Sequence, residues 1–204
     1  MKVLMLNGGG LDSLCMAKLA REQNPDAFVQ SLYVSYGLPS APHTAKSAQR
    51  IADRYCNAHE AFYMQKQTGD QKVSASLFTT SPTAAGNLFR HVPHYGLLLI
   101  VTAYSYAITN GFTHILCGIK KEARSPEFFK YFEKTLKTAK LTGSQPILET
   151  PLFDAEFALI HHLIKDDPLI TKTWSCNEDH ECGVCVKCQL RKKFAIIYDG
   201  GSDA

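Results

Sequence analysis

Four cysteines lie within thirteen residues near the C-terminus of this 204-residue chain, at the spacing C-x5-C-x2-C-x2-C. They are Cys176, Cys182, Cys185 and Cys188. Short turns can fold four thiolates at this spacing around one tetrahedral ion, the geometry that Zn²⁺ prefers. A pair of disulfides is the alternative, but the first residues, MKVLMLNGGG, do not resemble a secretion signal, and a reducing cytoplasm would keep the thiols free. We therefore expect a structural zinc knuckle in a cytoplasmic protein.

A run of glycines near the N-terminus is the second place where chemistry is expected. Gly8, Gly9 and Gly10 follow an apolar run and precede Asp12 and Ser13. Backbone N–H groups of a glycine turn can approach an anion closely, and the start of a helix adds positive potential. Ser13 could donate a hydrogen bond, whereas Asp12 would repel a phosphate unless a Mg²⁺ lay between them. The pattern is neither a Walker A loop nor GxGxxG, and a tight turn capped by Asp12 is the alternative interpretation.

Strand-like and helix-like patterns alternate along the chain and would position both sites. Apolar runs predict strands at residues 2–6, 28–36, 61–64, 114–118 and 147–152. Helical spacing predicts helices at residues 11–19, 42–59, 95–109, 126–140 and 155–165. This alternation predicts an α/β fold with a doubly wound, Rossmann-like parallel sheet. Ligands of such sheets bind beyond the carboxyl ends of the strands, and the first strand-to-helix turn, where the glycines lie, is the preferred phosphate site.

The composition fits one domain with an appendage. The net charge is +3, 45% of the residues are hydrophobic, and no apolar run approaches the roughly 20 residues of a membrane helix. We expect an α/β domain over residues 1–170 and a zinc knuckle with a C-terminal helix over residues 171–204. Residues 66–92 are turn-rich, and we predict a long loop that could act as a lid.

Several other residues are expected to have structural roles. Cys15, Cys56 and Cys117 sit among apolar residues and are interpreted as core residues rather than nucleophiles. Trp174, the only tryptophan, is expected to pack the knuckle onto the domain. Two histidine pairs lack a third ligand at a suitable spacing, so metal binding is not expected at His91 with His94 or at His161 with His162.

The glycine run also carries a family resemblance. GGLDS after the first strand resembles the pyrophosphatase loop, Ser-Gly-Gly-x-Asp-Ser, of enzymes that split ATP into AMP and pyrophosphate while adenylating a substrate. Further stretches resemble the 7-cyano-7-deazaguanine synthases of the QueC type: Tyr36-Gly37, TPLFD at 150–154, and TWSC at 173–176 leading to CxLR at 188–191. The resemblance spans the chain from end to end, and its C-terminal block is the most specific part.

The resemblance implies a PP-loop enzyme that adenylates the carboxylate of 7-carboxy-7-deazaguanine, accepts ammonia to give an amide, and dehydrates the amide to the nitrile. Its cofactors would be ATP, Mg²⁺ and Zn²⁺. The implied nucleotide-binding residues are Asn7, Gly8, Gly9, Gly10, Leu11, Asp12, Ser13 and Tyr36. The implied catalytic residues are Asp12, Ser13, Lys121 and Arg124, although a solvated basic turn is an equal interpretation of the last two.

The chain departs from the family pattern in three places. Gly8 stands where the family loop has Ser, His94 to Gly96 replace a Gly-Arg-Asn stretch, and residues 122–128 shorten a Tyr-Pro-Asp-Cys-Arg segment. Because of these changes, a second product is an alternative. It is an amide formed with another amine, such as a protein N-terminus, as some defence-associated members are thought to make.

A zinc-knuckle module that binds nucleic acid is the alternative of another class. It would use the basic residues beside the cysteines, namely Lys187, Arg191, Lys192 and Lys193. The favoured reading expects a small deazapurine and ATP as partners, no nucleic acid and no membrane, and a homodimer that could form through the apolar tail at 194–198.

Overall fold

The computed structural model describes residues 1–64, 79–82, 88–91, 95–120 and 146–198. Its elements are β1 (Lys2–Leu6), α1 (Leu11–Gln23), β2 (Phe28–Ser35), α2 (Ala41–Tyr55), β3 (Ala58–Tyr63), β4 (Thr79–Pro82), β5 (Leu88–His91), α3 (Tyr95–Thr109), β6 (His114–Leu116), β7 (Ile147–Glu149), α5 (Phe157–Ile164), the 3-10 helix η2 (Ile170–Lys172) and α6 (Val186–Lys193).

Five of the strands form one sheet in the order β3-β2-β1-β6-β7, and every neighbouring pair is parallel. The central strand is β1, whose Val3 lies opposite Val29 on one side and His114 on the other. The prediction of a doubly wound parallel sheet is therefore confirmed. The chain runs from β1 outward to β3 and then returns to β6, so the order reverses between β1 and β6, where such sheets bind ligands.

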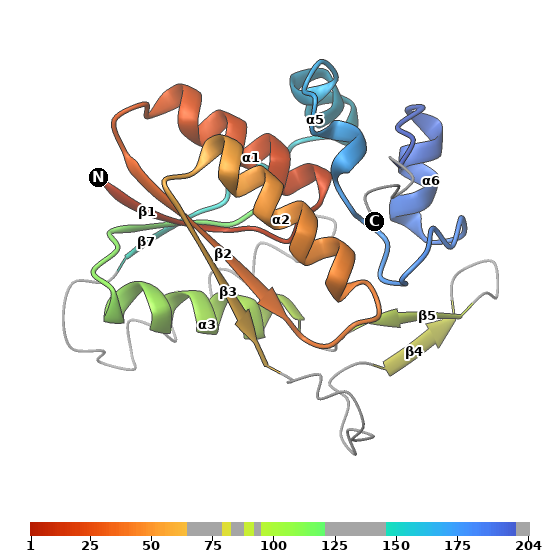
Figure 1. Ribbon diagram of the computed structural model, residues 1–204, viewed down its shortest axis with the longest axis horizontal. Coiled ribbons are helices and arrows are strands. Elements are labelled where there is room, and N and C mark those ends of the chain that lie inside the picture. The colour runs from red at the N-terminus through yellow and green to blue at the C-terminus, as the bar shows by residue number, and fades with distance from the viewer. Residues whose placement is uncertain (65–78, 83–87, 92–94, 121–145, 199–204) are drawn as a thin grey trace.

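Helices cover both faces of this sheet (Figure 1): α1, α2 and α5 lie on one face and α3 on the other. The side chains of β1 alternate between the two resulting cores. Met5 packs with Leu14 and Ile160 on the α1 and α5 side, whereas Leu4 packs with Ile100 on the α3 side. Because β1 is buried on both faces, its sequence is nearly continuously apolar.

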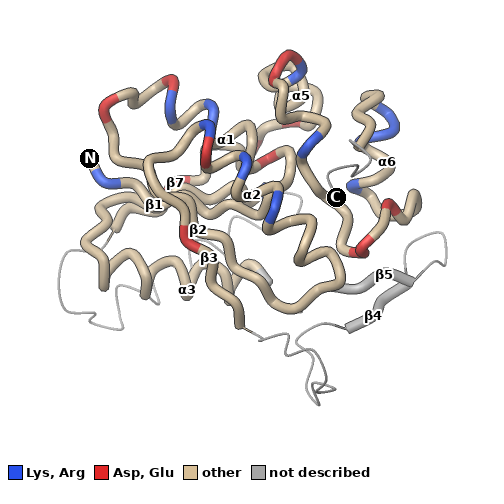
Figure 2. The backbone as a smooth tube through the Cα atoms, in the orientation of Figure 1, with Lys and Arg blue, Asp and Glu red and all other residues tan. Residues whose placement is uncertain are grey.

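The helix α3 has no charged residue among its fifteen, and it is drawn entirely in the neutral colour in Figure 2. Its inner side buries Leu99, Ile100 and Ala103, while Leu97 and Val101 are exposed. Among the helices of the described ranges, none is both long and apolar enough to cross a membrane.

The helix predicted over residues 42–59 ends earlier, at Tyr55, and β3 begins before the predicted strand. Cys56 already has extended dihedrals, φ −112° and ψ 163°. The N–H of Asn57 then donates to the carbonyl of Val29 on β2 at 2.7 Å. Pairing with β2 therefore takes over residues whose spacing alone continues the helical pattern.

The long loop predicted over residues 66–92 is wrong in part, because β4 and β5 within it form an antiparallel pair with Thr79 opposite His91. Proline and glycine in this segment predict turns, whereas the pairing of the two strands depends on residues several positions apart. The rest of the segment and the helix predicted over residues 126–140 lie outside the described residues. A lid over the site therefore stays a prediction, as does the domain division after residue 170.

Candidate nucleotide loop and metal centre

The glycine loop connects β1 to α1 and is packed tightly at Gly9. This residue has φ +74°, in the left-handed region, and a Cβ there would lie 2.4 Å from the carbonyl oxygen of Thr44 on α2. Only glycine fits this position without a shift of the backbone. Gly10 is the N-cap of α1, and its carbonyl accepts the N–H of Leu14 at 3.0 Å. The loop thus delivers the start of α1 to the carboxyl end of the central strand.

Asn7 braces the loop from beneath. Its side chain is 2% exposed, and its amide donates to the hydroxyl of Ser31 and to the carbonyl of Ala48, both at 2.9 Å. Its Oδ1 accepts the N–H of Gly9 at 3.0 Å. Asn7 therefore joins β1, β2, α2 and the loop. The structure shows this positioning role, whereas contact of Asn7 with a nucleotide stays a prediction. A polar residue at the end of an apolar strand was the available signal.

Ser13 and Asp12 occupy the first turn of α1. The Ser13 hydroxyl accepts the N–H of Gly8 at 2.9 Å, which leaves its proton available to a ligand. Asp12 lies beside the end of β6, since a Cβ added to Gly118 would be 3.6 Å from the Asp12 Cβ. Asp12 is therefore at the point between β1 and β6 where the strand order reverses, a place where such sheets bind ligands. Its role in binding stays a prediction.

The other predicted nucleotide-site residues are distributed differently. Lys121 and Arg124 lie outside the described residues, and Lys120 places its Nζ 5.9 Å from the ring centroid of Phe157. Tyr36 is 3% exposed and packs in the core on the α3 side, so its ring offers little surface for stacking. Their contribution to binding stays a prediction.

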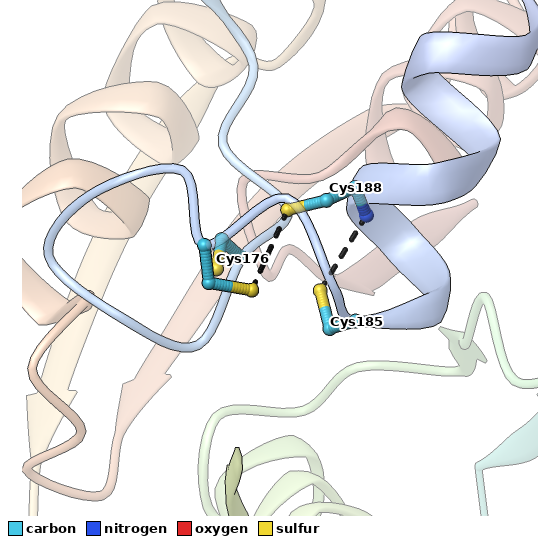
Figure 3. A group of neighbouring side chains, drawn as sticks. Cys176, Cys185 and Cys188 are labelled. Carbon is cyan, nitrogen blue, oxygen red and sulfur yellow. Dashed lines mark hydrogen bonds between the residues drawn. The ribbon is translucent and has the colours of Figure 1, made fainter. Parts of the chain in front are cut away.

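The four cysteines of the C-terminal cluster converge, as the sequence predicted. Figure 3 labels three of them, Cys176, Cys185 and Cys188, whose side chains point toward one another. Their sulfur atoms all lie within 4.8 Å of one another, and the sulfurs of Cys182 and Cys188 are 3.9 Å apart. Tetrahedral Zn–S bonds of about 2.3 Å would separate neighbouring sulfurs by about 3.8 Å. A cluster of several irons would hold its thiolates further apart, because the irons lie between them. The group therefore fits one tetrahedral ion.

Local structure also prepares this centre for a cation. The Cys185 sulfur accepts the N–H of Cys188 at the start of α6, at 3.4 Å, and the Cys176 sulfur accepts the N–H of Glu178 at 3.5 Å. A hydrogen bond with Cys185, together with burial, raises the pKa of the Cys176 thiol to about 12. A thiolate at this buried position needs a neighbouring cation, which a metal ion would supply.

Arg191 lies behind the cluster and is fully buried, at 0% exposure. Its Nη1 donates to the hydroxyl of Thr173 at 2.8 Å, and its guanidinium carbon is 3.7 Å from the ring centroid of Tyr198. Burial lowers its pKa below the usual value. The surface patch predicted for nucleic acid therefore loses Arg191 and consists of Lys187, Lys192 and Lys193, which are exposed.

Trp174 joins the knuckle to the loop, which confirms its predicted packing role. Its ring stacks on the ring of His43 of α2, with centroids 4.3 Å apart. It also contacts the ring of Tyr198, with centroids 4.6 Å apart. Its backbone N–H donates to the carbonyl of Gly9 at 2.9 Å. This last contact was not predicted, because no local pattern links residues so distant in the sequence.

The apolar tail expected to form a dimer interface packs largely on its own chain. Phe194 contacts Phe157 and His161 on α5, and Ile196 is 7% exposed. Ala195 and Ile197 stay exposed, Ile197 at 76%. The tail therefore offers less surface to a second copy than predicted.

The remaining cysteines behave as core residues. Burial raises the pKa values of Cys15, Cys56 and Cys117 to about 12 each, so their thiols stay protonated and weakly nucleophilic. This confirms their predicted structural role. Among the described side chains, the group of Cys176, Cys182, Cys185 and Cys188 is the one that could hold a metal ion.

The family model of the queuosine biosynthesis protein QueC matches residues 2–197. The chain belongs to the QueC family. A 7-cyano-7-deazaguanine synthase of Methanospirillum hungatei is 30% identical over 208 residues, covering 94% of this chain and 93% of the relative. One from Methanosphaerula palustris is 26% identical over 219 residues, covering 95% and 93%.

The QueC fold is also found in solved structures. The U34-tRNA thiolase NcsA from Methanococcus maripaludis, solved with its [4Fe-4S] cluster, aligns with a TM-score of 0.52 at 15% identity. The alignment covers 81% of this chain and 55% of that chain. At this identity the likeness shows the shared PP-loop fold alone. The QueC family match and the relatives named 7-cyano-7-deazaguanine synthase support an enzyme of the PP-loop ATP pyrophosphatase type.

Proposed function

We propose that this QueC family member is an ATP-dependent, AMP-forming synthetase that acts on 7-carboxy-7-deazaguanine or a similar deazapurine carboxylate. The observation that carries the proposal is the glycine loop itself. Its backbone is fixed by Asn7, its helix begins at Gly10, and its Asp12 lies at the reversal point of the sheet. The relatives named 7-cyano-7-deazaguanine synthase support the choice of substrate class.

The reaction would proceed in two activations. The substrate carboxylate oxygen attacks the α-phosphorus of ATP, pyrophosphate leaves, and the acyl adenylate forms. Ammonia then attacks the acyl carbon, AMP leaves, and a proton is lost to give the amide. A second ATP adenylates the amide oxygen with release of pyrophosphate, and loss of AMP and of both amide protons gives the nitrile. Adenylation is needed because AMP is a far better leaving group than oxide.

The protein's contribution is positioning and charge neutralisation rather than a nucleophile. The N–H groups of Leu11 and Ser13 in the first turn of α1 have no partner within the helix and are suited to phosphate oxygens. The Ser13 hydroxyl can donate its proton to the same group. Asp12 would hold a Mg²⁺ that neutralises the phosphates, and Lys121 and Arg124 would add positive charge.

We also propose that the four-cysteine group holds Zn²⁺ in a structural role. Its sulfurs have the mutual separations of one tetrahedral ion, and four protein sulfurs fill the coordination sphere. The ion would fix the segment that carries Trp174, which in turn contacts the glycine loop.

A second acceptor is the main alternative. The acyl adenylate could be attacked by another amine, such as a protein N-terminus, which would stop the reaction at a conjugated amide. A nucleic-acid-binding module is the alternative of another class, although the burial of Arg191 weakens its basic patch.

The test is an incubation of purified protein with ATP and 7-carboxy-7-deazaguanine, with and without ammonia. Mass spectrometry identifies the products, and a coupled assay follows pyrophosphate release. Asp12→Asn should lower the rate on the order of 100-fold, whereas Asp26→Asn, at an exposed position, should not change it. Nitrile formed without a protein partner would remove the conjugation alternative. Equal background rates in wild type and Asp12→Asn would refute the enzymatic proposal.

A further inference from the structure

Residues 173–176, which we call the strap, run directly along the glycine loop. The Trp174 N–H donates to the carbonyl of Gly9 at 2.9 Å. A Cβ added to Gly10 would lie 3.7 Å from both the Trp174 carbonyl oxygen and the Ser175 Oγ. The strap therefore brings one side-chain hydroxyl, that of Ser175, to the residue where α1 begins.

The first turn of α1 has few hydroxyl groups of its own. Gly8 and Gly10 have no side chain, and no side-chain hydrogen bond caps the helix at Gly10. Ser13 already accepts the N–H of Gly8. Ser175 is half-buried. Its hydroxyl lies at the start of α1, where no side chain caps the helix, and can donate to an anion held by the helix N–H groups.

Both ends of the strap are anchored. Thr173 is 1% exposed, accepts a hydrogen bond from Arg191, and donates its own hydroxyl proton to the carbonyl of Ile170 at 2.7 Å. Cys176 is 2% exposed and belongs to the metal-ligand group. Ser175 is thus held between two buried residues, and a donor fixed in advance binds a charged group without paying for its own ordering.

We propose that Ser175 donates a hydrogen bond to a phosphate group of ATP bound at the glycine loop, so that the metal-binding knuckle forms one wall of the nucleotide site. This inference rests on the proposed function, because it requires ATP at the loop. It adds a binding residue from the far end of the chain, 165 positions beyond Gly10 in the numbering.

Isothermal titration calorimetry with MgATP and with adenosine tests this role. Ser175→Ala should raise the Kd for MgATP about tenfold, the effect of losing one hydrogen bond to a charged group. The Kd for adenosine, which has no phosphate, should not change. Ser175→Thr keeps the hydroxyl and should bind MgATP within about threefold of wild type, well inside the spread of one hydrogen bond. Ser105→Ala, at an exposed position on α3, is the matched control and should bind both ligands like wild type.

The outcomes separate three cases. A purely structural Ser175 would lower the unfolding temperature of Ser175→Ala and weaken adenosine and MgATP alike, which overturns the inference. MgATP binding by Ser175→Ala within twofold of wild type also overturns it, while the proposed function stands. Failure of the wild-type chain to bind MgATP refutes the proposed function and this inference together.

Discussion

The packing of Gly9 against α2 makes a quantitative prediction about stability. Alanine at Gly9 would adopt φ +74°, which costs roughly 1–2 kcal/mol for an L-residue. Its Cβ would also lie 2.4 Å from the Thr44 carbonyl oxygen and 3.0 Å from the Ser47 Cβ. The oxygen belongs to the α2 backbone and cannot rotate away, so the loop or the helix must shift, at a further cost of about 1–3 kcal/mol.

A reduction of unfolded-state entropy by alanine offsets about 0.4–1 kcal/mol of this. We therefore expect Gly9→Ala to lose about 1–5 kcal/mol of unfolding free energy. For a chain of this size, that loss corresponds to a fall of about 2–20 °C in the unfolding temperature. Urea denaturation followed by circular dichroism measures the free energy, and a thermal melt measures the temperature.

Two other glycines separate the contributions. Gly111 has φ +67° but nothing within 4 Å of an added Cβ, so Gly111→Ala should show the dihedral cost alone, about 1 kcal/mol. Gly10 has φ −91° and only ordinary contacts at 3.7 Å, so Gly10→Ala should cost only the poorer N-capping by alanine, less than about 1 kcal/mol. If Gly9→Ala and Gly111→Ala lose the same free energy, the steric part of the reasoning is wrong.

Three further predictions concern the knuckle, the brace of the glycine loop and His59 in β3. If the four cysteines hold the proposed ion, its chelation, like Cys176→Ser, should lower the unfolding temperature and change the emission of Trp174, the single tryptophan. Unchanged emission would contradict the contact between knuckle and loop. Asn7→Ala should cost about 1–3 kcal/mol, because it removes one of the hydrogen bonds of the buried Ser31 hydroxyl and leaves the N–H of Gly9 without its partner. An Asn7→Ala variant as stable as wild type in urea would show that the brace is unimportant. Burial lowers the pKa of His59 below 6.5. The unfolded chain therefore takes up a proton more readily than the folded chain as the pH falls through 6.5, and the stability should fall with the pH. His59→Gln should show a shallower fall in unfolding temperature between pH 7.5 and 5.5, and an equal slope in the two proteins would refute this.

Most of the strands and helices, the glycine loop and the cysteine group were predictable because their sequence signals are local. The apolar runs of β1 and β2 reflect burial on both faces, and the spacing of the cysteines reflects the turns needed to surround one ion. The glycine run reflects a backbone conformation that Gly9 adopts. Each of these requirements acts on residues that are close in the sequence.

The errors arose where distant residues decide the outcome. The end of α2 at Tyr55 depends on pairing between β3 and β2, and the pairing of β4 with β5 depends on a register that composition does not show. Arg191 lies in a basic stretch of sequence that is typical of an exposed surface. In the fold its guanidinium is buried, and the Thr173 hydroxyl and the Tyr198 ring compensate the loss of water around it. The contact of Trp174 with Gly9 joins opposite ends of the chain, so only the folded structure reveals it.

The central place of β1 in the sheet has a consequence for synthesis on the ribosome. One edge of β1 pairs with β2 early, but its other edge stays open until β6 emerges, about 110 residues later. At typical elongation rates this interval lasts roughly 5–20 s. During that time an apolar strand with unpaired backbone groups is exposed, which favours wrong pairing between nascent chains. The strand order therefore couples completion of the sheet to a pairing that closes only late in synthesis.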